Sequence, residues 1–285
     1  MAPRRSSYTY LLGDSRTEAA RLRAQARLWD PTAHALFDRL KIHRGMRVLE
    51  IGPGAGSLHR ELRRRVRGPV DSVEPSETFA RGLDRLAARD GFGRGQHWPA
   101  NLADVRLPHG RYDVIFARWV FLFLPNPRAH VRQLAAALKP GGVLAIEDYQ
   151  RETLRMVPPP AAWERFLAAD RAFFESQGGD ASIGARLPAL YTDAGLKLVD
   201  ITPTVKSGHP GSPVWNWLSA YFLGGVIDRL AGLGGFTTAD ARQLTRDWVA
   251  ASKEPTSLLI APALIDVVGR RRGQRERREQ RKQLE

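Results

Sequence analysis

Cysteine is absent from the 285-residue sequence. Disulfide frameworks, iron–sulfur clusters, thiolate nucleophiles and cysteine-based zinc sites are therefore excluded, and we predict no metal site. Long hydrophobic runs are missing as well. The longest uncharged stretch, residues 207–227, is interrupted by glycine and proline, and residues 1–14 lack the apolar core of a signal peptide. We therefore expect a cytoplasmic protein without a membrane span.

The charge is unbalanced, with 44 Lys and Arg against 30 Asp and Glu, which gives a formal net charge of +14. Residues 270–285 concentrate it, since they hold seven Arg and one Lys against three Glu. Such a segment cannot bury an apolar face, so we predict a basic, disordered tail over residues 270–285. A basic tail can attract nucleic acid, but the stacking aromatic side chains typical of RNA recognition are missing from it. A nucleic-acid partner is therefore disfavoured.

The remaining composition, 43% hydrophobic and 26% charged, is typical of a globular protein that can build a large core. Between residues 45 and 148, helical patterns alternate with strand-like apolar runs, which are residues 47–51, 70–74, 112–117 and 143–147. This alternation predicts βαβ units and a parallel sheet.

The regions on either side have patterns of their own. Residues 18–40 are typical of a helix, which Asp30-Pro31 is expected to break into two pieces. Residues 196–205 and 258–268 predict two further strands, which could pair as a hairpin at the edge of the sheet. Residues 215–253, between them, predict helix.

A glycine-rich turn, Gly52-Pro53-Gly54-Ala55-Gly56, follows the first predicted strand and precedes a helix. Glycines two residues apart allow a sharp turn and a close approach to a ligand, but several nucleotide-binding folds share such a loop. Two acidic residues reduce the number of ligands that this loop could bind. Glu50, at the end of the strand, would repel a pyrophosphate. Glu74, at the end of the next strand, can accept hydrogen bonds from both hydroxyls of a ribose.

Together with Lys139-Pro140-Gly141-Gly142 before a later strand, these motifs resemble those of the class I S-adenosylmethionine-dependent methyltransferases. They are most similar to the small-molecule branch that includes the quinone-methyltransferase-like, type 11 enzymes. The resemblance implies an α/β, Rossmann-like, seven-stranded and mostly parallel sheet with a reversed final hairpin. It also implies S-adenosyl-L-methionine as cofactor. The cofactor-binding residues that it implies are Tyr10, Arg21, Gln25, Glu50, Gly52, Gly54, Gly56, Glu74, Pro75, Asn101, Leu102 and Arg118.

The resemblance also divides the chain. Residues 1–44 correspond to an N-terminal helical lid, in which Arg21 and Gln25 lie four residues apart on one helix face and could meet the methionine carboxylate of the cofactor. The other predicted segments are a cofactor-binding core at 45–150, a helical substrate cover at 151–195, the remaining core strands with a helical insert at 196–269, and the tail.

The acceptor is expected to be a bulky and largely apolar small molecule of secondary metabolism. Where the resembled branch carries a histidine and then an aspartate after the fourth strand, this sequence has Phe123 and Asn126. Eight aromatic residues outside the central sheet indicate an apolar pocket, a core of their own or a contact within a homodimer; they are Trp163, Phe166, Phe173, Phe174, Trp215, Trp217, Tyr221 and Phe222.

A methyl group on a sulfonium is already activated, so a base is needed only if the acceptor must lose a proton. The candidate catalytic residues are Tyr149, at the end of the fifth predicted strand, where ligands of open α/β sheets bind, and His209, in a Gly-His-Pro turn. Asp148 is a further candidate for the base, but its position is equally consistent with capping the segment that follows it.

Two other functions stay open. Enzymes that methylate the exocyclic amines of bases carry an Asn/Asp-Pro-Pro-aromatic motif where this chain has Ala117-Arg118-Trp119-Val120. An RNA-modifying methyltransferase is therefore the less favoured alternative. A protein of the same fold that keeps the cofactor structurally and catalyses a cyclisation or isomerisation would have the same cofactor motifs.

Overall fold

The computed structural model describes the backbone of residues 16–273 and the side chains of residues 24–273. Two of the predicted cofactor-binding residues are affected: Tyr10 lies outside the described residues, and the side chain of Arg21 is not among those described. Most of the predicted basic tail, residues 274–285, also lies outside them.

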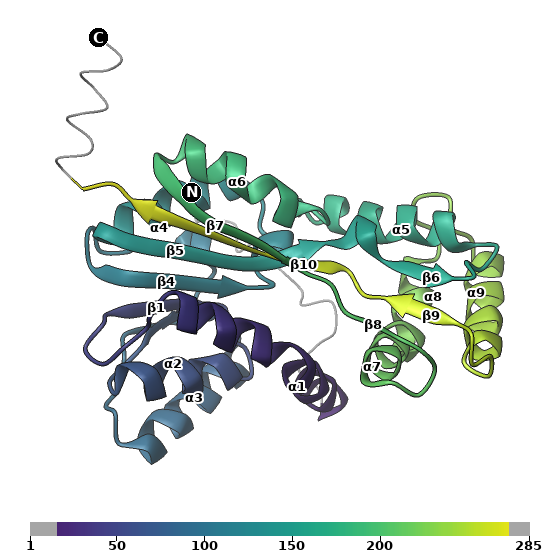
Figure 1. Ribbon diagram of the computed structural model, residues 1–285, viewed down its shortest axis with the longest axis horizontal. Coiled ribbons are helices and arrows are strands. Elements are labelled where there is room, and N and C mark those ends of the chain that lie inside the picture. The colour runs from purple at the N-terminus through teal and green to yellow at the C-terminus, as the bar shows by residue number, and fades with distance from the viewer. Residues whose placement is uncertain (1–15, 274–285) are drawn as a thin grey trace, which may run out of the picture.

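Helices and strands alternate along most of the described chain (Figure 1). The helices are α1 (Arg16–Arg39), α2 (Ser57–Val66), α3 (Glu77–Asp90), α4 (Pro127–Ala137), α5 (Trp163–Ser176), α6 (Ile183–Asp193), α7 (Pro213–Tyr221), α8 (Ile227–Leu230) and α9 (Thr238–Ala251). The strands are β1 (Val48–Ile51), β2 (Asp71–Val73), β3 (His97–Trp98), β4 (Tyr112–Arg118), β5 (Leu138–Gln150), β6 (Arg155–Val157), β7 (Leu196–Thr204), β8 (Ser207–Gly208), β9 (Leu258–Ile260) and β10 (Ala263–Arg271).

The central sheet has seven strands in the order β3-β2-β1-β4-β5-β10-β7. The strands from β3 to β5 pair in parallel, whereas β10 is antiparallel to both β5 and β7. The last two strands therefore form a reversed hairpin at the edge of the sheet. The predicted seven-stranded, mostly parallel, Rossmann-like sheet is confirmed.

Successive residues of β4 face opposite sides of the sheet. Val114 and Phe116 belong to a buried cluster that includes residues of α1 and α2, whereas Ile115 and Ala117 belong to one that includes residues of α4 and α6. Helices α1 and α2 accordingly lie on one face and α4 and α6 on the other (Figure 1). Both faces of the parallel strands are thus buried, as such sheets require.

Helix α1 runs without interruption through Pro31, where the sequence predicts a break. Proline removes one helical hydrogen bond and crowds the preceding turn, at a cost of about 3 kcal/mol. Trp29, Ala33, Leu36 and Phe37 are fully buried around it. Because burying each large apolar side chain stabilises the fold by roughly 1.5–3 kcal/mol, the packing of α1 outweighs the proline.

The segment 258–268, predicted as one strand, is divided between two sheets. β9 pairs with β6 and β8 in a small three-stranded sheet, and β10 enters the central sheet. Pro262 lies between them, and it has no N–H group to continue a ladder. At its other end β10 extends to Arg271, whose Nη1 donates to the carbonyl of Ala136 at 2.9 Å. The predicted tail therefore begins inside a strand.

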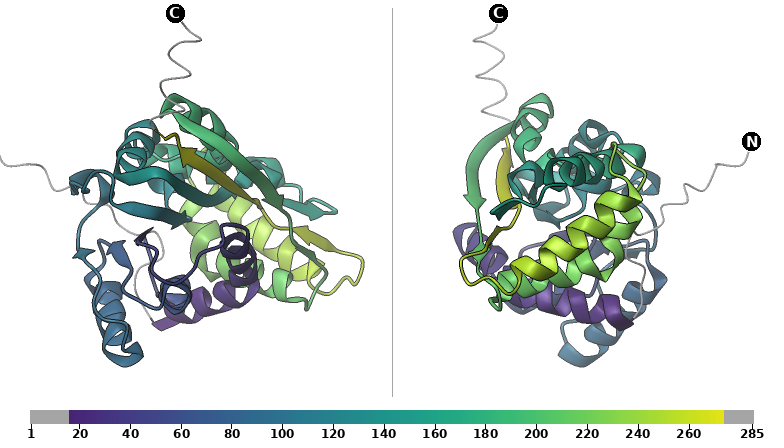
Figure 2. Two further views of the ribbon diagram at one scale, coloured as in Figure 1. Left: turned by 60° about the vertical axis from the view of Figure 1, so that its left-hand side comes forward. Right: turned by 90° about the vertical axis from the view of Figure 1, so that its right-hand side faces the viewer.

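Helices α5, α7, α8 and α9 gather with the small sheet at the end of the central sheet where β4 ends, and we call this group the cover (Figures 1 and 2). Helix α6 packs on β5, β7 and β10 instead, so the predicted cover segment 151–195 is shared between cover and core. None of the helices in the described part of the chain has the length and apolarity to cross a bilayer.

Candidate cofactor and acceptor site

The glycine-rich turn between β1 and α2 has a backbone conformation that favours glycine. Gly52, Gly54 and Gly56 have φ angles of 66°, 52° and 80°, in the left-handed region that costs other residues about 1–2 kcal/mol. At Gly52, a Cβ atom would lie only 2.6 Å from Cγ2 of Val120. The first glycine thus allows the turn and the segment after β4 to approach closely.

The Glu74 carboxylate holds this turn from the end of β2. One of its oxygens accepts the N–H of Gly54 at 3.0 Å, and the other accepts the N–H of Ser76 at 2.9 Å. Burial raises the pKa of Glu74, while these two N–H groups act in the opposite direction. Each carboxylate oxygen can accept more than one hydrogen bond, so Glu74 keeps acceptor capacity for the hydroxyl groups of a ligand.

Glu50 is paired with a buried histidine that no sequence motif marks. Its Oε2 lies 2.8 Å from Nδ1 of His59 on α2, and both residues are only 3% exposed. The contact fixes the orientation of the Glu50 carboxylate, in which Oε1 has no hydrogen-bond partner among the described residues. Glu50 can therefore accept a hydrogen bond from a ligand without losing His59.

A cavity of about 820 Å³ opens beside these residues, within the size range of small-molecule sites. We call the part formed by the glycine-rich turn, the end of β2 and the loop after β3 the glycine-loop half. Of the residues predicted to bind cofactor, the cavity brings together Gln25, Glu50, Gly52, Gly54, Glu74, Pro75, Asn101, Leu102 and Arg118. Gly56 does not line it and instead precedes the first turn of α2.

The rest of the cavity, which we call the aromatic half, lies between the segment after β4 and the cover. Its apolar and aromatic lining residues are Trp119, Val120, Leu122, Phe123, Leu124, Tyr149, Phe174, Trp217, Leu218, Tyr221 and Phe222. The structure thus places Phe123 in the cavity wall, whereas Asn126 caps α4 by accepting the N–H of Ala129. Four of the eight predicted aromatic residues line the cavity. Of the other four, Phe173 is half-buried, and Trp163, Phe166 and Trp215 are buried in the cover.

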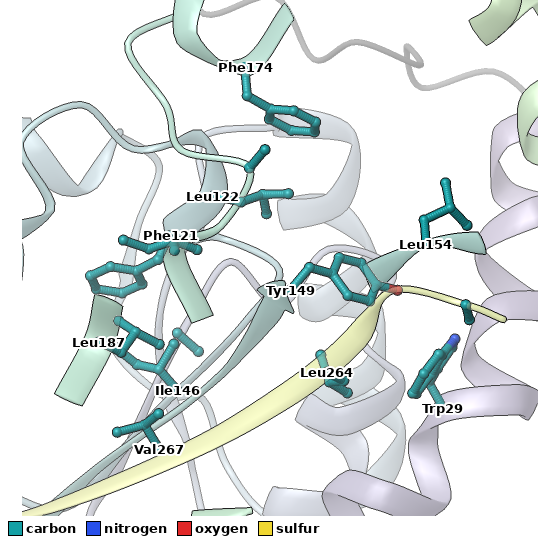
Figure 3. Packing of buried hydrophobic residues seen from close by; sticks show 14 of the residues in the cluster. Trp29, Phe121, Leu122, Ile146, Tyr149, Leu154, Phe174, Leu187, Leu264 and Val267 are labelled. Carbon is teal, nitrogen blue, oxygen red and sulfur yellow. The ribbon is translucent and has the colours of Figure 1, made fainter. Parts of the chain in front are cut away.

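Tyr149 lies within an aromatic cluster of this half. Its ring stacks on Trp119 with centroids 5.6 Å apart, and the Trp29 ring meets it edge-on at 6.2 Å. Figure 3 shows Tyr149 between Trp29 on one side and Leu122 and Phe174 on the other. Burial raises the pKa of Tyr149, so its phenol stays neutral at pH 7. A neutral phenol can donate a hydrogen bond but is a poor base, which disfavours proton abstraction by Tyr149.

Arg118, at the end of β4, connects the cavity to α1. Its Nη2 donates to Asp30 at 2.5 Å, its Nε lies 4.0 Å from Glu147, and its guanidinium lies over the Trp119 ring at 4.3 Å. Burial raises the pKa of Glu147 well above its ordinary value, while the charge of Arg118 acts in the opposite direction. The Asp30–Arg118 pair therefore fixes α1, with Gln25 and Trp29, against the sheet.

The two histidines near this end of the molecule differ in position. His209 is exposed in the turn before α7 and does not line the cavity, so the structure does not bring this predicted catalytic residue to the site. His130, on the first turn of α4, does line the cavity. Burial lowers the pKa of His130, which leaves its imidazole uncharged at neutral pH.

Several lining residues, or residues that support the lining, have no motif in the sequence. Phe79 and His130 lie in helices, Trp29 resembles any apolar helix residue, and Arg151 follows β5 directly. Among these residues, only Arg151 has a weak signal in the sequence, because it comes just after the end of a parallel strand, where open α/β sheets bind ligands.

Comparison with known proteins gives concordant matches. A family model described as "Methyltransferase domain" matches residues 21–200. Trans-aconitate 2-methyltransferase of Rhodopseudomonas palustris is 36% identical over 136 residues, which are 47% of this chain and 45% of that protein. Methyltransferase GfsG of Streptomyces halstedii is 29% identical over 65% of this chain and 67% of its own length. The chain thus spans about half the length of the first of these relatives.

Among solved structures, geranyl diphosphate C-methyltransferase of Streptomyces coelicolor, in complex with Mg²⁺, geranyl diphosphate and S-adenosyl-L-homocysteine, superposes with a TM-score of 0.56. The superposition covers 91% of this chain and 86% of that one at 15% identity. At this level of identity the likeness is one of fold.

Proposed function

Because the chain belongs to the methyltransferase-domain family, we propose that it transfers the methyl group of S-adenosyl-L-methionine to a bulky, largely apolar small molecule of secondary metabolism. The observation that carries the proposal is one continuous cavity with two chemically different halves. The glycine-loop half has two carboxylates, Glu50 and Glu74, that can accept hydrogen bonds beside the glycine-rich turn. The aromatic half is lined mainly by apolar side chains.

The residues of the glycine-loop half fit this cofactor. Any side chain at Gly52 would collide with Val120, so the space beside β1 depends on glycine. Glu74 presents carboxylate oxygens suited to the two hydroxyls of a ribose, and Glu50 has an oxygen suited to an ammonium group. When bound, S-adenosyl-L-methionine supplies a methyl group that is already activated by the sulfonium charge.

The chain's own contribution is then to position the acceptor and to exclude water. Leu122, Phe123 and Phe222 line the aromatic half with carbon, so water gains little there by hydrogen bonding. The neutral imidazole of His130 is the one side chain of the described lining that combines an uncharged state at pH 7 with the capacity to accept a proton. We also propose that five further residues bind the cofactor, because all of them line the cavity: Gln25, Pro75, Asn101, Leu102 and Arg118.

Relatives named for small acceptors, trans-aconitate and geranyl diphosphate, support a small-molecule acceptor. The predicted homodimer, the cytoplasmic location and the disfavoured binding of nucleic acid stay predictions.

The experiment is a mass-shift assay with S-adenosyl-L-methionine labelled at the methyl group, offered with a panel of aromatic and isoprenoid acceptors. We expect a labelled product from an apolar member of the panel and, at a cofactor concentration that does not saturate the variant, much less from Glu74→Ala. Binding of a nicotinamide cofactor in place of S-adenosyl-L-methionine would overturn the proposal. So would product formation, such as cyclisation, in which no label leaves the cofactor.

A further inference from the structure

A buried arginine interrupts the carbon lining of the aromatic half. Arg151 begins the short turn Arg151–Thr153 directly after β5, is 6% exposed, and lines the cavity. The proposed methyl transfer gives this residue no task. Buried charges in proteins are paired or bound to a ligand, so the partners of Arg151 decide what it can do.

Within the described part of the chain, Arg151 uses only one edge of its guanidinium. Its Nε and Nη2 donate to the two oxygens of Asp170 on α5, at 2.7 Å each. Burial disfavours the charged guanidinium, but the attraction of Asp170 outweighs it, and the pKa of Arg151 lies above its ordinary value. The third nitrogen, Nη1, has no hydrogen-bond partner among the described residues. A permanently charged donor is thus left for a ligand.

The surroundings of Arg151 hold it in place without using that donor. Its guanidinium lies 5.1 Å from the centre of the Phe174 ring and 5.9 Å from that of Tyr221. The Tyr149 hydroxyl, close enough for Arg151 to affect its ionisation, also has no hydrogen-bond partner in the described structure. Arg151 and Tyr149 thus each bring a hydrogen-bond donor without a partner in the described structure to a half-cavity lined mainly by apolar side chains.

Stability does not account for the pair. Taking two charges out of water costs several kcal/mol per ion, and replacing a buried ion pair by apolar side chains of similar volume is often neutral or stabilising. Asp170 lies on α5 in a cover that already has a buried aromatic core. Arg151 lines the cavity, whereas Asp170 lies behind it, and a charged cavity residue that keeps one donor unused is consistent with a binding role.

The aromatic rings of this half are not arranged to take a cation. Arg118 already lies over the Trp119 ring at 4.3 Å, Tyr149 stacks on the same indole, and Lys206 lies 5.3 Å from the centre of the Trp29 ring. The described lining residues of this half include no carboxylate that could pair with an ammonium group. An oxygen with a negative charge can instead pair with the guanidinium of Arg151.

From this arrangement we propose that Arg151 is a specificity-determining residue that binds an anionic oxygen of the acceptor through Nη1. The acceptor is then an apolar acid, with a hydrocarbon body among Leu122, Phe174 and Phe222 and a carboxylate or enolate at Arg151. Charge-assisted hydrogen bonds of this kind are about twice as strong as neutral ones. The inference rests on the proposed function, because it assigns the aromatic half to the acceptor.

The test uses three naphthalene probes that differ in one substituent: 2-naphthoate, which is anionic, 2-acetonaphthone, which has a neutral carbonyl, and 2-(aminomethyl)naphthalene, which is cationic. Binding is measured by calorimetry on the full chain saturated with S-adenosyl-L-homocysteine. We expect naphthoate to bind roughly 10- to 100-fold more tightly than the ketone, and the amine to bind more weakly than both. Equal affinities for the three would overturn the proposal.

The variants separate recognition from folding. Arg151→Met/Asp170→Leu removes the pair without leaving a buried carboxylate unpaired, and we expect it to lose the preference for naphthoate over the ketone while still binding S-adenosyl-L-homocysteine. Arg155→Met removes an exposed charge four residues away and should keep the preference. A double variant that folds and still prefers naphthoate would refute the role of Arg151. If S-adenosyl-L-homocysteine does not bind the folded wild type, that result contradicts the proposed function itself, independently of the role of Arg151.

Discussion

Replacing Gly52 by alanine tests the close approach on which the proposed cofactor site depends. Two costs add at this position. The φ angle of 66° costs a residue with a Cβ about 1–2 kcal/mol, and the new Cβ would lie 2.6 Å from Cγ2 of Val120, an overlap of the kind that costs about 1–3 kcal/mol more. We expect Gly52→Ala to lower the free energy of unfolding by roughly 2–5 kcal/mol.

Gly54 provides the matched control. Its φ angle is 52°, but a Cβ there would have nothing within 4 Å. Gly54→Ala should therefore cost only the backbone strain, about 1–2 kcal/mol. Urea unfolding of both variants, followed by circular dichroism, measures the difference directly.

Val120 allows the overlap to be isolated. Because Val120→Ala removes the Cγ2 atom, Gly52→Ala should be milder in that background by about 1–3 kcal/mol, a coupling measured by the double-mutant cycle. Gly54→Ala should show no coupling to Val120→Ala. Equal losses for the two glycine variants, or a cycle without coupling at Gly52, would refute the reasoning.

Three further predictions concern stability. Burial raises the pKa of Asp148 from its ordinary 3.8 to about 7. The folded state therefore binds the Asp148 proton more tightly than the unfolded state, and the stability gained in this way is lost as the pH rises through 7. The free energy of unfolding, measured by denaturant titration, should be roughly 2–3 kcal/mol lower at pH 8 than at pH 5 on account of Asp148. Tyr149→Phe removes a hydroxyl without a partner and should leave thermal stability unchanged, whereas Tyr112→Phe loses a 2.9 Å bond to Asp71 and should cost about 1–2 kcal/mol; equal melting temperatures would contradict this. Thr237→Ala breaks the capping box of α9 and should cost about 1 kcal/mol by chemical unfolding, while an equal loss in Thr238→Ala, one residue inside the helix, would show that the cap is not responsible.

The local part of the fold could be predicted from the sequence. Strand-like runs and the glycine-rich turn depend on short-range patterns, and the positive φ angles at Gly52, Gly54 and Gly56 explain why glycine stands there. The final hairpin joins strands that are distant in the sequence, and its pairing was expected from the family resemblance. The predicted break at Pro31 was wrong, because the sequence does not show how much surface α1 buries on both sides of the proline.

The candidate site could be predicted only where a motif marks it. Glu50 and Glu74 could be predicted because they stand at the ends of strand-like runs, but Asp170, the partner of Arg151, is 19 residues away on α5. Such a pair has no spacing that a sequence pattern can detect. His209 shows the opposite error, since a histidine in a turn looked chemically suitable and the fold leaves it outside the cavity.

Cofactor binding by the wild type and by Glu74→Ala, measured by calorimetry with S-adenosyl-L-methionine, is the most direct test of the proposed function. Glu77→Ala is the matched control, because Glu77 is an exposed carboxylate three residues further along the chain. We expect one cofactor per chain, a roughly 30- to 100-fold loss of affinity in Glu74→Ala from losing charge-assisted hydrogen bonds, and no loss in Glu77→Ala. Absence of binding by the folded wild type, or equal affinity in Glu74→Ala, would contradict the assignment of this cavity to the cofactor.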